Sequence, residues 1–352
     1  MTRSDSSPTL ELLAAGVGVR LVGLDLLGDA SAGWVRAALR PLGTPIDNPD
    51  VTIEVSQMSV RPGRRIAHGM ALVEDGVWVG DRFGRGGILR IHNGHLSAVV
   101  SPDIPPTWLN DLYVLLVDAA LARRGGMVLR MSAVQTATRR IGVSGFSGSG
   151  KTRLLLTLIG VHGATLIGDS VVGCLADGTI APMAVNLKIR PEHRDLFPME
   201  GSIVSASRTW LARKFEGSDS AGGRRHRSPG RRVGPLVAER IRARGERQLD
   251  GGGLGIGSVG GNGRLDSLVM LRHSSAVAPT DFLLTTTAVS LNAGHLVQSV
   301  ARGLWPEAAA MRLAHQARNA LVAEVVRHAS VIEVPPPLLP APSRELAAEL
   351  VA

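Results

Sequence analysis

The sequence predicts an α/β fold built around a mixed β-sheet, and three observations support this prediction. An apolar run, a glycine-rich turn and an amphipathic helix follow one another within residues 141–156, IGVSGFSGSGKTRLLL. Strand-like and helix-like runs alternate on both sides of this stretch. Two apolar runs that read as strands, at 127–134 and from residue 141, precede a single helix, which is typical of the core of an α/β domain.

Composition sets the broad class of the protein. The chain has 352 residues, enough for about two domains. Its 44% hydrophobic and 20% charged residues are typical of a soluble globular protein, and only 3% are aromatic, so we expect a core of Leu, Val, Ile and Ala. The net charge of +9 favours anionic partners. Basic residues without interleaved aromatic residues are a poor match to single-stranded nucleic acid binding.

The termini and the cysteine content predict a cytoplasmic protein without a membrane partner. Cys174 is the single cysteine, which excludes a disulfide within the chain and a thiolate metal cluster. The N-terminal segment MTRSDSSPTLELL lacks the pattern of a signal peptide, and residues 1–10 are expected to be loose. No apolar run approaches the ~20 residues that span a bilayer.

Residues 145–152, GFSGSGKT, fit the phosphate-binding loop pattern of Gly, four residues, Gly-Lys-Ser/Thr. Glycines let backbone N–H groups converge on an anion at the positive end of the next helix. Lys151, one of three lysines in the chain, can reach the β- and γ-phosphates, and the Thr152 hydroxyl can bind Mg²⁺. The alternative is a Gly/Ser turn that carries Lys-Thr by chance. The pattern predicts ATP and Mg²⁺ as cofactors, held by Gly145, Ser147, Gly148, Ser149, Gly150, Lys151, Thr152 and Arg153.

The first hundred residues predict a small α+β region. We expect a strand at 17–24, a helix at 31–42 with Ser31 as its N-cap, and a strand at 51–55. Short β-like runs from 65 to 100, with hairpin signals at Asp75-Gly76 and Asn93-Gly94, predict an antiparallel meander. His92 and His95 flank the second turn as metal ligands or, with no acidic or cysteine partner nearby, as surface residues.

The middle of the chain places a carboxylate after a strand. We expect a helix at 105–124, ended by Gly125-Gly126, and a strand at 127–134. After the loop helix, a strand at 164–167 leads to Asp169, and a hairpin at 171–175 and 180–185 follows. Enzymes with phosphate loops place a metal-binding or catalytic carboxylate at such a strand end, although Asp169 could also cap a turn.

The last third contains a basic, glycine-rich insertion. Nine arginines lie between Arg224 and Arg247, in a mobile loop and a short basic helix that form either a solvated insertion or a flap over phosphate or acidic substrate. The glycine-rich run at 251–263 lacks the strand and helix of a dinucleotide fingerprint. We then expect strands at 265–272 and 329–334, and helices at 292–303, 305–326 and 343–351.

Five pieces in a fixed order resemble a known family. VLRMSAV, the phosphate loop, TLIGDS, VNLKIRP and LDSLVMLR together resemble the C-terminal domain of HPr kinase/phosphorylase, and are closer to the HPr-kinase-like proteins of peptide-modifying gene clusters. The resemblance covers 105–335 and implies a P-loop core related to phosphoenolpyruvate carboxykinase. We therefore expect a nucleotide-binding domain at 105–335, and the rest of the chain predicts an N-terminal recognition or packing region at 1–104, a basic insertion at 216–263 within the domain, and a tail helix at 336–352.

The resemblance also implies roles for residues. Gly145, Gly148, Gly150 and Lys151 would hold phosphate, Thr152 would hold Mg²⁺, and Asp169 would be the general base or a metal ligand. The chain departs from the family twice: Arg130 stands where relatives carry His, and Ser170 stands where they carry a second Asp. Arg130 cannot act as a base at neutral pH, but it could hold phosphate as part of the catalytic site. Asp250, in DGGGLGIGSV, is loosely similar to the acidic residue of the family signature EIRGLGIINV.

Three functions follow from these patterns. The first is an ATP-dependent kinase, a phosphotransferase acting on a hydroxyl, with serine first, of a peptide or small protein. The second is a catalytically degenerate nucleotide-binding relative that binds a peptide or serves as an accessory protein, motivated by Ser170 and Arg130. The third, a nucleic-acid-linked ATPase, rests only on the arginine run. The sequence is compatible with a homo-oligomer.

Overall fold

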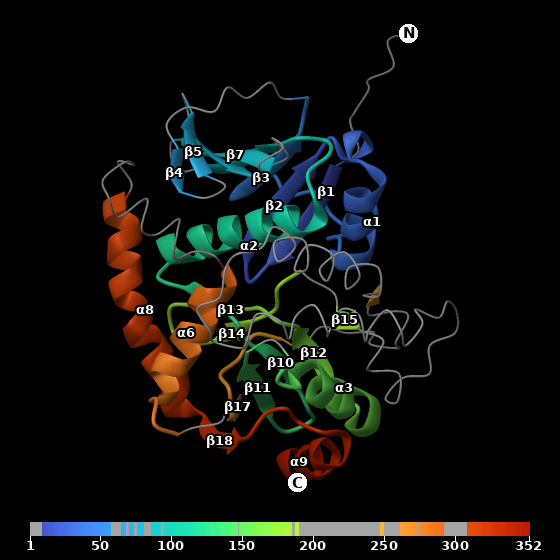
Figure 1. The fold of residues 1–352 in the computed structure, drawn as a ribbon, viewed down its shortest axis with the longest axis vertical. Helices are drawn as coiled ribbons and strands as arrows, with labels where there is room; N and C mark the ends of the chain where they lie inside the picture. Colours follow the sequence, from blue (N-terminus) through green and yellow to red (C-terminus); the bar gives the residue numbers. More distant parts are fainter. Residues whose placement is uncertain are drawn as a thin grey trace, which may run out of the picture.

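Two mixed β-sheets organise the fold, and the helix α2 (Pro106–Arg123) lies between the larger one and the rest of the molecule (Figure 1). The computed structural model describes residues 9–57, 65–67, 70–73, 76–80, 86–92, 95–146, 148–184, 187–189, 247–249, 261–272, 275–291 and 308–352. These ranges contain six α-helices. The prediction of an α/β fold with a mixed sheet is confirmed.

The N-terminal sheet has eight strands in the order β1-β2-β3-β8-β7-β6-β5-β4. Pairing is parallel between β2 and β3 and between β3 and β8, and antiparallel elsewhere. The antiparallel meander from residue 65 to residue 100 is therefore confirmed. The strand bounds are β1 (Thr9–Ala14), β2 (Val17–Val22), β3 (Val51–Val55), β4 (Arg65–Ala67), β5 (Met70–Val73), β6 (Gly76–Gly80), β7 (Gly86–His92) and β8 (His95–Val100).

The first strand corrects the expectation that residues 1–10 are loose, because Thr9 and Leu10 already pair with β2. The tight turn between the two strands forces this register. Ala15 and Gly16 adopt left-handed conformations with φ of 51° and 79°, the geometry of a two-residue hairpin turn. The Ala15 N–H also donates to the Pro182 carbonyl at 2.8 Å, which ties the hairpin to the segment that follows Ala181.

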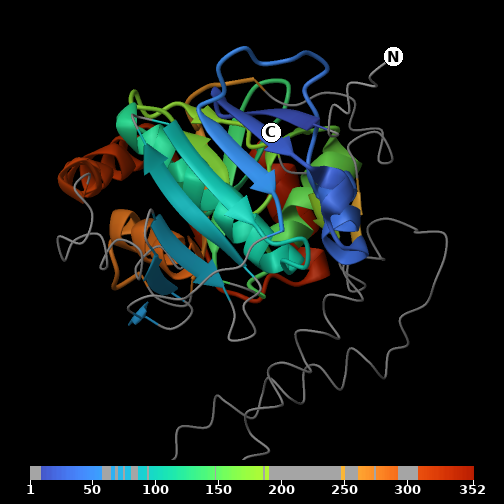
Figure 2. The same cartoon turned by 90° about the horizontal axis from the view of Figure 1, so that it is seen from above.

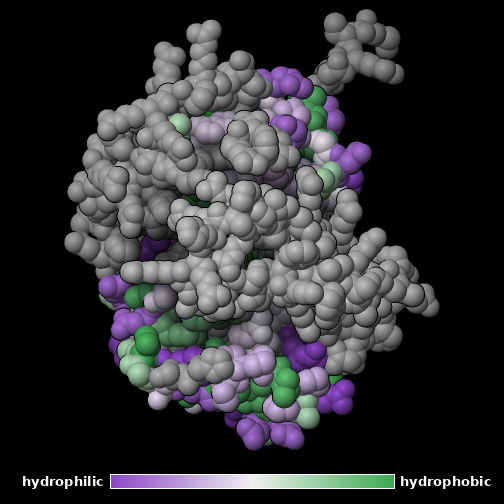
Figure 3. Space-filling model, in the orientation of Figure 1, coloured by the Kyte–Doolittle hydropathy of each residue, from purple (hydrophilic) through white to green (hydrophobic). Residues whose placement is uncertain are grey.

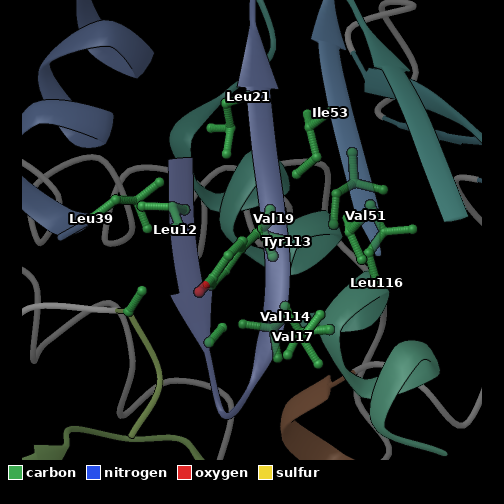
Figure 4. Close-up of a cluster of buried hydrophobic side chains, with 14 of the residues drawn as sticks. Leu12, Val17, Val19, Leu21, Leu39, Val51, Ile53, Tyr113, Val114 and Leu116 are labelled. Atoms are coloured by element: carbon green, nitrogen blue, oxygen red, sulfur yellow. The ribbon is translucent and has the colours of Figure 1, made fainter. Parts of the chain in front are cut away.

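Helix α2 covers one face of the N-terminal sheet with apolar side chains (Figures 1 and 2). Tyr113 is fully buried, and Figure 4 shows it pointing toward β1 and β2, near Leu12 and Val19. Burial raises the pKa of the Tyr113 hydroxyl above its ordinary value. The helix begins with Pro106 in its first turn, as its sequence predicts.

The helix α1 (Asp29–Ala38) is shorter than the predicted helix at 31–42, and Ser31 is not its N-cap. Gly28 occupies the N-cap position, and Ser31 lies inside the first turn. Ser31 is 2% exposed, and its hydroxyl donates to the carbonyl of Ile104. The serine therefore binds a distant backbone group, which sequence spacing does not reveal.

The second sheet has five strands in the order β12-β10-β11-β17-β18. Strands β11, β17 and β18 are parallel, whereas β10 is antiparallel to both β11 and β12. The strand bounds are β10 (Ser132–Gln135), β11 (Arg140–Gly145), β12 (Thr165–Gly168), β17 (Ser267–Leu271) and β18 (Ser330–Val334).

Helices cover both faces of this sheet (Figure 1). Val269 and Leu271 of β17 pack in one cluster with α3 (Lys151–His162) and α9 (Pro340–Val351). Leu268 and Met270 pack in another with α6 (Pro279–Leu291) and α8 (Ala308–His328). This alternation follows from the period of two in a strand, and it makes a layered α/β/α unit.

The predicted single strand at 127–134 is wrong, because the chain changes sheets within it. β9 (Met127–Leu129) pairs with β13 (Val172–Cys174) in a three-stranded sheet that also includes β14 (Ile180–Ala181). β10 belongs to the five-stranded sheet. Arg130 and Met131 form the bend, where the Met131 N–H donates to the Leu129 carbonyl at 3.1 Å. The hairpin between β13 and β14 is confirmed at Asp177-Gly178.

The region after β17 adds a helix that the sequence did not predict. Residues 279–291 form α6, although three successive threonines and a valine favour strands. Helix α8 and strand β18 confirm the predictions for that region, and α9 begins at Pro340, three residues before the expected start. The predicted helix at 292–303 lies outside the described residues. So does most of the insertion at 216–263, apart from residues 261–263 and β16 (Arg247–Leu249), which pairs with β15 (Leu187–Ile189).

A buried ion pair connects the two halves of the molecule. Asp118 of α2 accepts a hydrogen bond from the Val128 N–H at 2.7 Å and pairs with Arg318 of α8. Both side chains are largely buried, so each charge depends on the other. The described helices include none that is long and apolar enough to cross a membrane.

Candidate functional site

Strand directions bring most of the described candidate residues to one edge of the five-stranded sheet. The carboxyl ends of β11, β12, β17 and β18 and the amino end of β10 meet at this edge. The phosphate loop leaves β11 there, and Asp169 follows β12 two strands away. Since neighbouring strands are about 4.8 Å apart, the two strand ends are separated by roughly 10 Å.

The loop backbone has the shape that its glycines predict. Gly148 and Gly150 adopt left-handed conformations with φ of 80° and 99°. A Cβ on Gly145 would lie 2.6 Å from the Ser149 Oγ, whereas a Cβ on Gly148 would meet no atom within 4 Å. The loop is therefore compact toward the sheet and open beside Gly148. Ser147 lies outside the described residues.

Lys151 is fixed by the loop that it completes. Its Nζ donates to the carbonyls of Gly145 at 2.7 Å and Phe146 at 2.8 Å, and the residue is 7% exposed. The side chain lies in the first turn of α3, where the helix presents its positive end. The Lys151 ammonium group and the amino end of α3 therefore both contribute positive charge beside the loop.

One orphaned hydroxyl supports the fit of a phosphate group. Ser149 is 5% exposed, and its Oγ has no hydrogen-bond partner among the described residues. Leaving a buried polar group unsatisfied costs free energy, and a phosphate oxygen would satisfy it. The glycines, Lys151 and this hydroxyl together fit the anion that the sequence predicts.

A magnesium ion would need oxygen ligands from the nucleotide. Thr152 and Arg153 follow Lys151 in the first turn of α3 and are half-buried. Across the described ranges, no group of three or more His, Cys, Asp or Glu side chains could hold a metal ion. The Thr152 hydroxyl and the Asp169 carboxylate are the two metal ligands that the sequence predicts, and a Mg²⁺ site that used them would take its other ligands from phosphate oxygens and water.

Asp169 is buried where two neighbouring segments of the chain both cross between the three-stranded and the five-stranded sheet. β10 continues from β9 through Arg130, and β12 continues into β13 through Asp169. Asp169 is 3% exposed, and its Oδ1 accepts hydrogen bonds from the Ser132 hydroxyl at 3.0 Å and the Ser170 hydroxyl at 3.4 Å. We call Arg130, Ser132, Asp169 and Ser170 the carboxylate corner.

Arg130 belongs to this corner through its backbone. Its N–H donates to the Thr287 hydroxyl of α6 at 3.0 Å, and its carbonyl accepts from the Ser144 hydroxyl at 3.4 Å. The unpredicted helix α6 therefore fixes the bend between β9 and β10. The Arg130 side chain is half-buried, and its phosphate-binding role remains a prediction.

Two neighbours of the loop were missed by sequence reasoning. The Leu338 N–H donates to the Ser149 carbonyl at 3.0 Å, and a Cβ on Gly150 would lie 2.7 Å from the Leu338 Cβ. The segment before α9 thus supports the loop, and the sequence contains no local signal for such a contact. Arg272 directly follows β17, next to Leu271, which pairs with Gly145, and its position at the end of the predicted strand at 265–272 could have identified it.

Arg272 anchors an aromatic pair beside the loop. It is 6% exposed, pairs with Glu333 of β18 and lies 5.7 Å from the ring centre of Phe282. Phe282 in turn contacts Phe146 edge-to-face, with ring centres 5.6 Å apart. Phe146 is 47% exposed. Figure 3 shows further apolar side chains at the surface of the lower half of the molecule, which contains this sheet.

No protein-family model and no curated protein sequence matches this chain. Two features of the fold bear most on function: the glycine-rich loop at the start of α3, and the buried Asp169 carboxylate at the same sheet edge.

Proposed function

We propose that the protein is a cytoplasmic, ATP-dependent kinase that transfers the γ-phosphoryl group of ATP to a hydroxyl group of a peptide or small protein. Serine is the first candidate acceptor. The observation that carries the proposal is the shared sheet edge of the phosphate loop and the Asp169 carboxylate. One group can hold the donor phosphates, and the other can receive the acceptor's proton.

The HPr-kinase-like fold is part of this proposal. Its support is the order of the family-like pieces, since VLRMSAV, the loop, TLIGDS and LDSLVMLR map onto β9–β10, β11–α3, β12 and β17. The carboxyl ends of β11, β12 and β17 point to one edge, as a shared active site requires.

The residues divide the proposed reaction between them. Loop N–H groups and the Lys151 ammonium bind the β- and γ-phosphates and stabilise the charge that develops during transfer. Asp169 takes the acceptor proton while the acceptor oxygen forms its bond to phosphorus and the bond from phosphorus to the ADP oxygen breaks. Thr152 would hold Mg²⁺, which neutralises phosphate charge when bound; the alternative role of Asp169 is to bind this ion instead of taking the proton.

A second function is favoured by one observation. Ser170 stands where the family carries its second acid, and its N–H is bound to the Ser132 hydroxyl at 3.1 Å. A corner with one carboxylate could serve a protein that binds ATP without turnover and presents a peptide to another enzyme. Stoichiometric ATP binding without any phosphorylated product, with the true partner present, would favour this alternative.

The test is intact-mass spectrometry of candidate peptides incubated with the protein, ATP and Mg²⁺. Peptides encoded beside the gene come first. Wild-type protein should add one phosphate, and Lys151→Met should abolish the addition, because methionine retains the buried stem but removes the ammonium group. Lys188→Met, which removes a lysine of β15, is the matched control and should remain active. Equal activity of the Lys151→Met variant would contradict the assignment.

A further inference from the structure

We propose that Ser132 is a positioning residue that fixes the Asp169 carboxylate for phosphoryl transfer, an inference that rests on the proposed function. Ser132 is fully buried at the amino end of β10, and Asp169 follows β12, the neighbouring strand. The serine side chain contacts the proposed base and is itself inaccessible to solvent. We therefore expect Ser132 to act on the reaction only through the orientation of the Asp169 carboxylate.

The Ser132 hydroxyl makes two hydrogen bonds with opposite roles. It donates to Asp169 Oδ1 at 3.0 Å and accepts the Ser170 N–H at 3.1 Å. A hydroxyl has one proton to donate, and Ser132 donates it to Asp169. The Ser170 N–H binds a lone pair of the same hydroxyl oxygen. The two bonds fix the direction of the Ser132 hydroxyl, which, with the Ser170 hydroxyl at 3.4 Å, helps to orient the Asp169 carboxylate.

The backbone at Ser170 shows why this support is needed. Ser170 adopts a left-handed conformation with φ of 68°, which is uncommon for a residue other than glycine. The Asp169–Ser170 turn is therefore not set by local preference alone. The bond from the Ser170 N–H to Ser132 attaches this strained turn to β10.

The position of the bond in the topology adds to its effect. β9–β10 and β12–β13 pass from one sheet to the other at the carboxylate corner, where the pairing of β10 with β12 shifts register between Ala133 and Val134. Regular ladder bonds are interrupted there, so side chains must hold the two strands in register. Ser132 supplies such a link through its hydrogen bond to Asp169, the proposed general base.

Loss of this link should lower the turnover rate more than it weakens binding. A carboxylate displaced by about 1 Å can lower a rate on the order of 100-fold while leaving the substrate bound. A serine that merely satisfies buried polar atoms would behave differently, because its removal would lower stability without a selective loss of turnover.

The experiment compares Ser132→Ala with Ser343→Ala in full-length protein. Ser343 is also fully buried, and its hydroxyl contacts Thr157 at 3.2 Å on the far side of α3. For each variant, kcat, the KM for ATP, the melting temperature and the amide exchange of Ser170 are measured. Ser132→Ala should lower kcat on the order of 30- to 100-fold, with the KM for ATP within about 3-fold of wild type, and should speed Ser170 exchange. Ser343→Ala should leave kcat within about 3-fold.

A Ser132→Ala variant with wild-type kcat, or one whose kcat falls no further than that of Ser343→Ala at equal loss of stability, would overturn the inference alone. Wild-type protein that binds ATP but transfers no phosphate would overturn the proposed function and this inference together. If Ser132→Ala does not fold, Ser132→Cys, which keeps the volume and replaces the hydroxyl by a weaker donor, is used instead. The same lowering of kcat is then expected.

Discussion

The phosphate loop and the carboxylate corner lie at one sheet edge, yet the chain encodes them in different ways. The loop is a run of consecutive residues from Gly145 to Thr152, and glycine conformations shape it. The corner joins residues from two strands, Ser132 on one and Asp169 and Ser170 after the other. A motif can therefore reveal a binding loop directly, whereas the group proposed to do the chemistry depends on strand pairing.

The difference predicts separable failures. Damage to the loop should weaken nucleotide binding, because its amides and Lys151 contact phosphate in the proposed complex. Damage to the corner should slow transfer while ATP remains bound.

The largest effect is expected from Asp169→Asn. The amide retains the shape and the acceptor oxygen that faces Ser132, but it cannot take the acceptor proton. General-base removal lowers rates about 10²- to 10⁴-fold, so phosphoryl transfer should fall by about that factor. Single-turnover transfer measured by mass spectrometry checks the result. A rate within about 10-fold of wild type would assign the proton to another group.

A smaller effect on stability is expected from Gly150→Ala. Its new Cβ would lie 2.7 Å from Leu338 Cβ and 3.0 Å from Leu338 backbone atoms, in a left-handed conformation. Gly148→Ala is the matched control, because it shares the left-handed backbone but meets no atom within 4 Å.

Chemical denaturation of the nucleotide-free protein measures both glycine variants. Gly148→Ala should cost about 1–2 kcal/mol of the free energy of unfolding, the usual cost of the left-handed conformation. Gly150→Ala should cost more, about 3 kcal/mol, since overpacking adds to this cost. Equal losses in the two variants would show that Leu338 does not support the loop.

The smallest effect concerns Cys174, which ends β13 and is fully buried. Burial raises the pKa of its thiol from 9.0 to about 12. The folded state therefore keeps a proton that the unfolded state loses above pH 9, so stability is unchanged below that pH and falls as pH rises from 9 toward 12.

The measurement is urea unfolding at pH 8 and pH 10. Between these values wild type should lose about 1.4 kcal/mol more than Cys174→Ala, the equivalent of about one pKa unit. If the free energy of unfolding fell equally with pH in the two proteins, water would reach the Cys174 thiol, which would contradict its burial.

Local patterns predicted the parts of the fold that depend on local chemistry. The helix α2 starts at a proline and ends near Gly125-Gly126, and the loop glycines have the required conformations. Strand existence was also predictable where apolar runs are bounded by turns, as in β11 and β17.

Long-range pairing explains what the sequence did not reveal. The run at 127–134 looks continuous in the sequence, yet the chain bends at Arg130, whose N–H binds the Thr287 hydroxyl of α6. The threonines of α6 favour a strand, so the sequence did not predict this helix. Leu338 reaches the loop from almost two hundred residues away in the chain. Ser132 was seen only as part of a family-like string, because its bond to Asp169 requires knowledge of the β10–β12 pairing.

The most direct test combines two measurements on wild type, Lys151→Met and Asp169→Asn: isothermal titration calorimetry with ATP in the absence of Mg²⁺, and a separate transfer assay with ATP and Mg²⁺. We expect Lys151→Met to lose most of its affinity for ATP, whereas Asp169→Asn should bind ATP as tightly as wild type in the titration and fail to transfer phosphate in the assay. Wild-type affinity in Lys151→Met, or an equal loss of affinity in both variants, would contradict the division between a phosphate-binding loop and a catalytic corner.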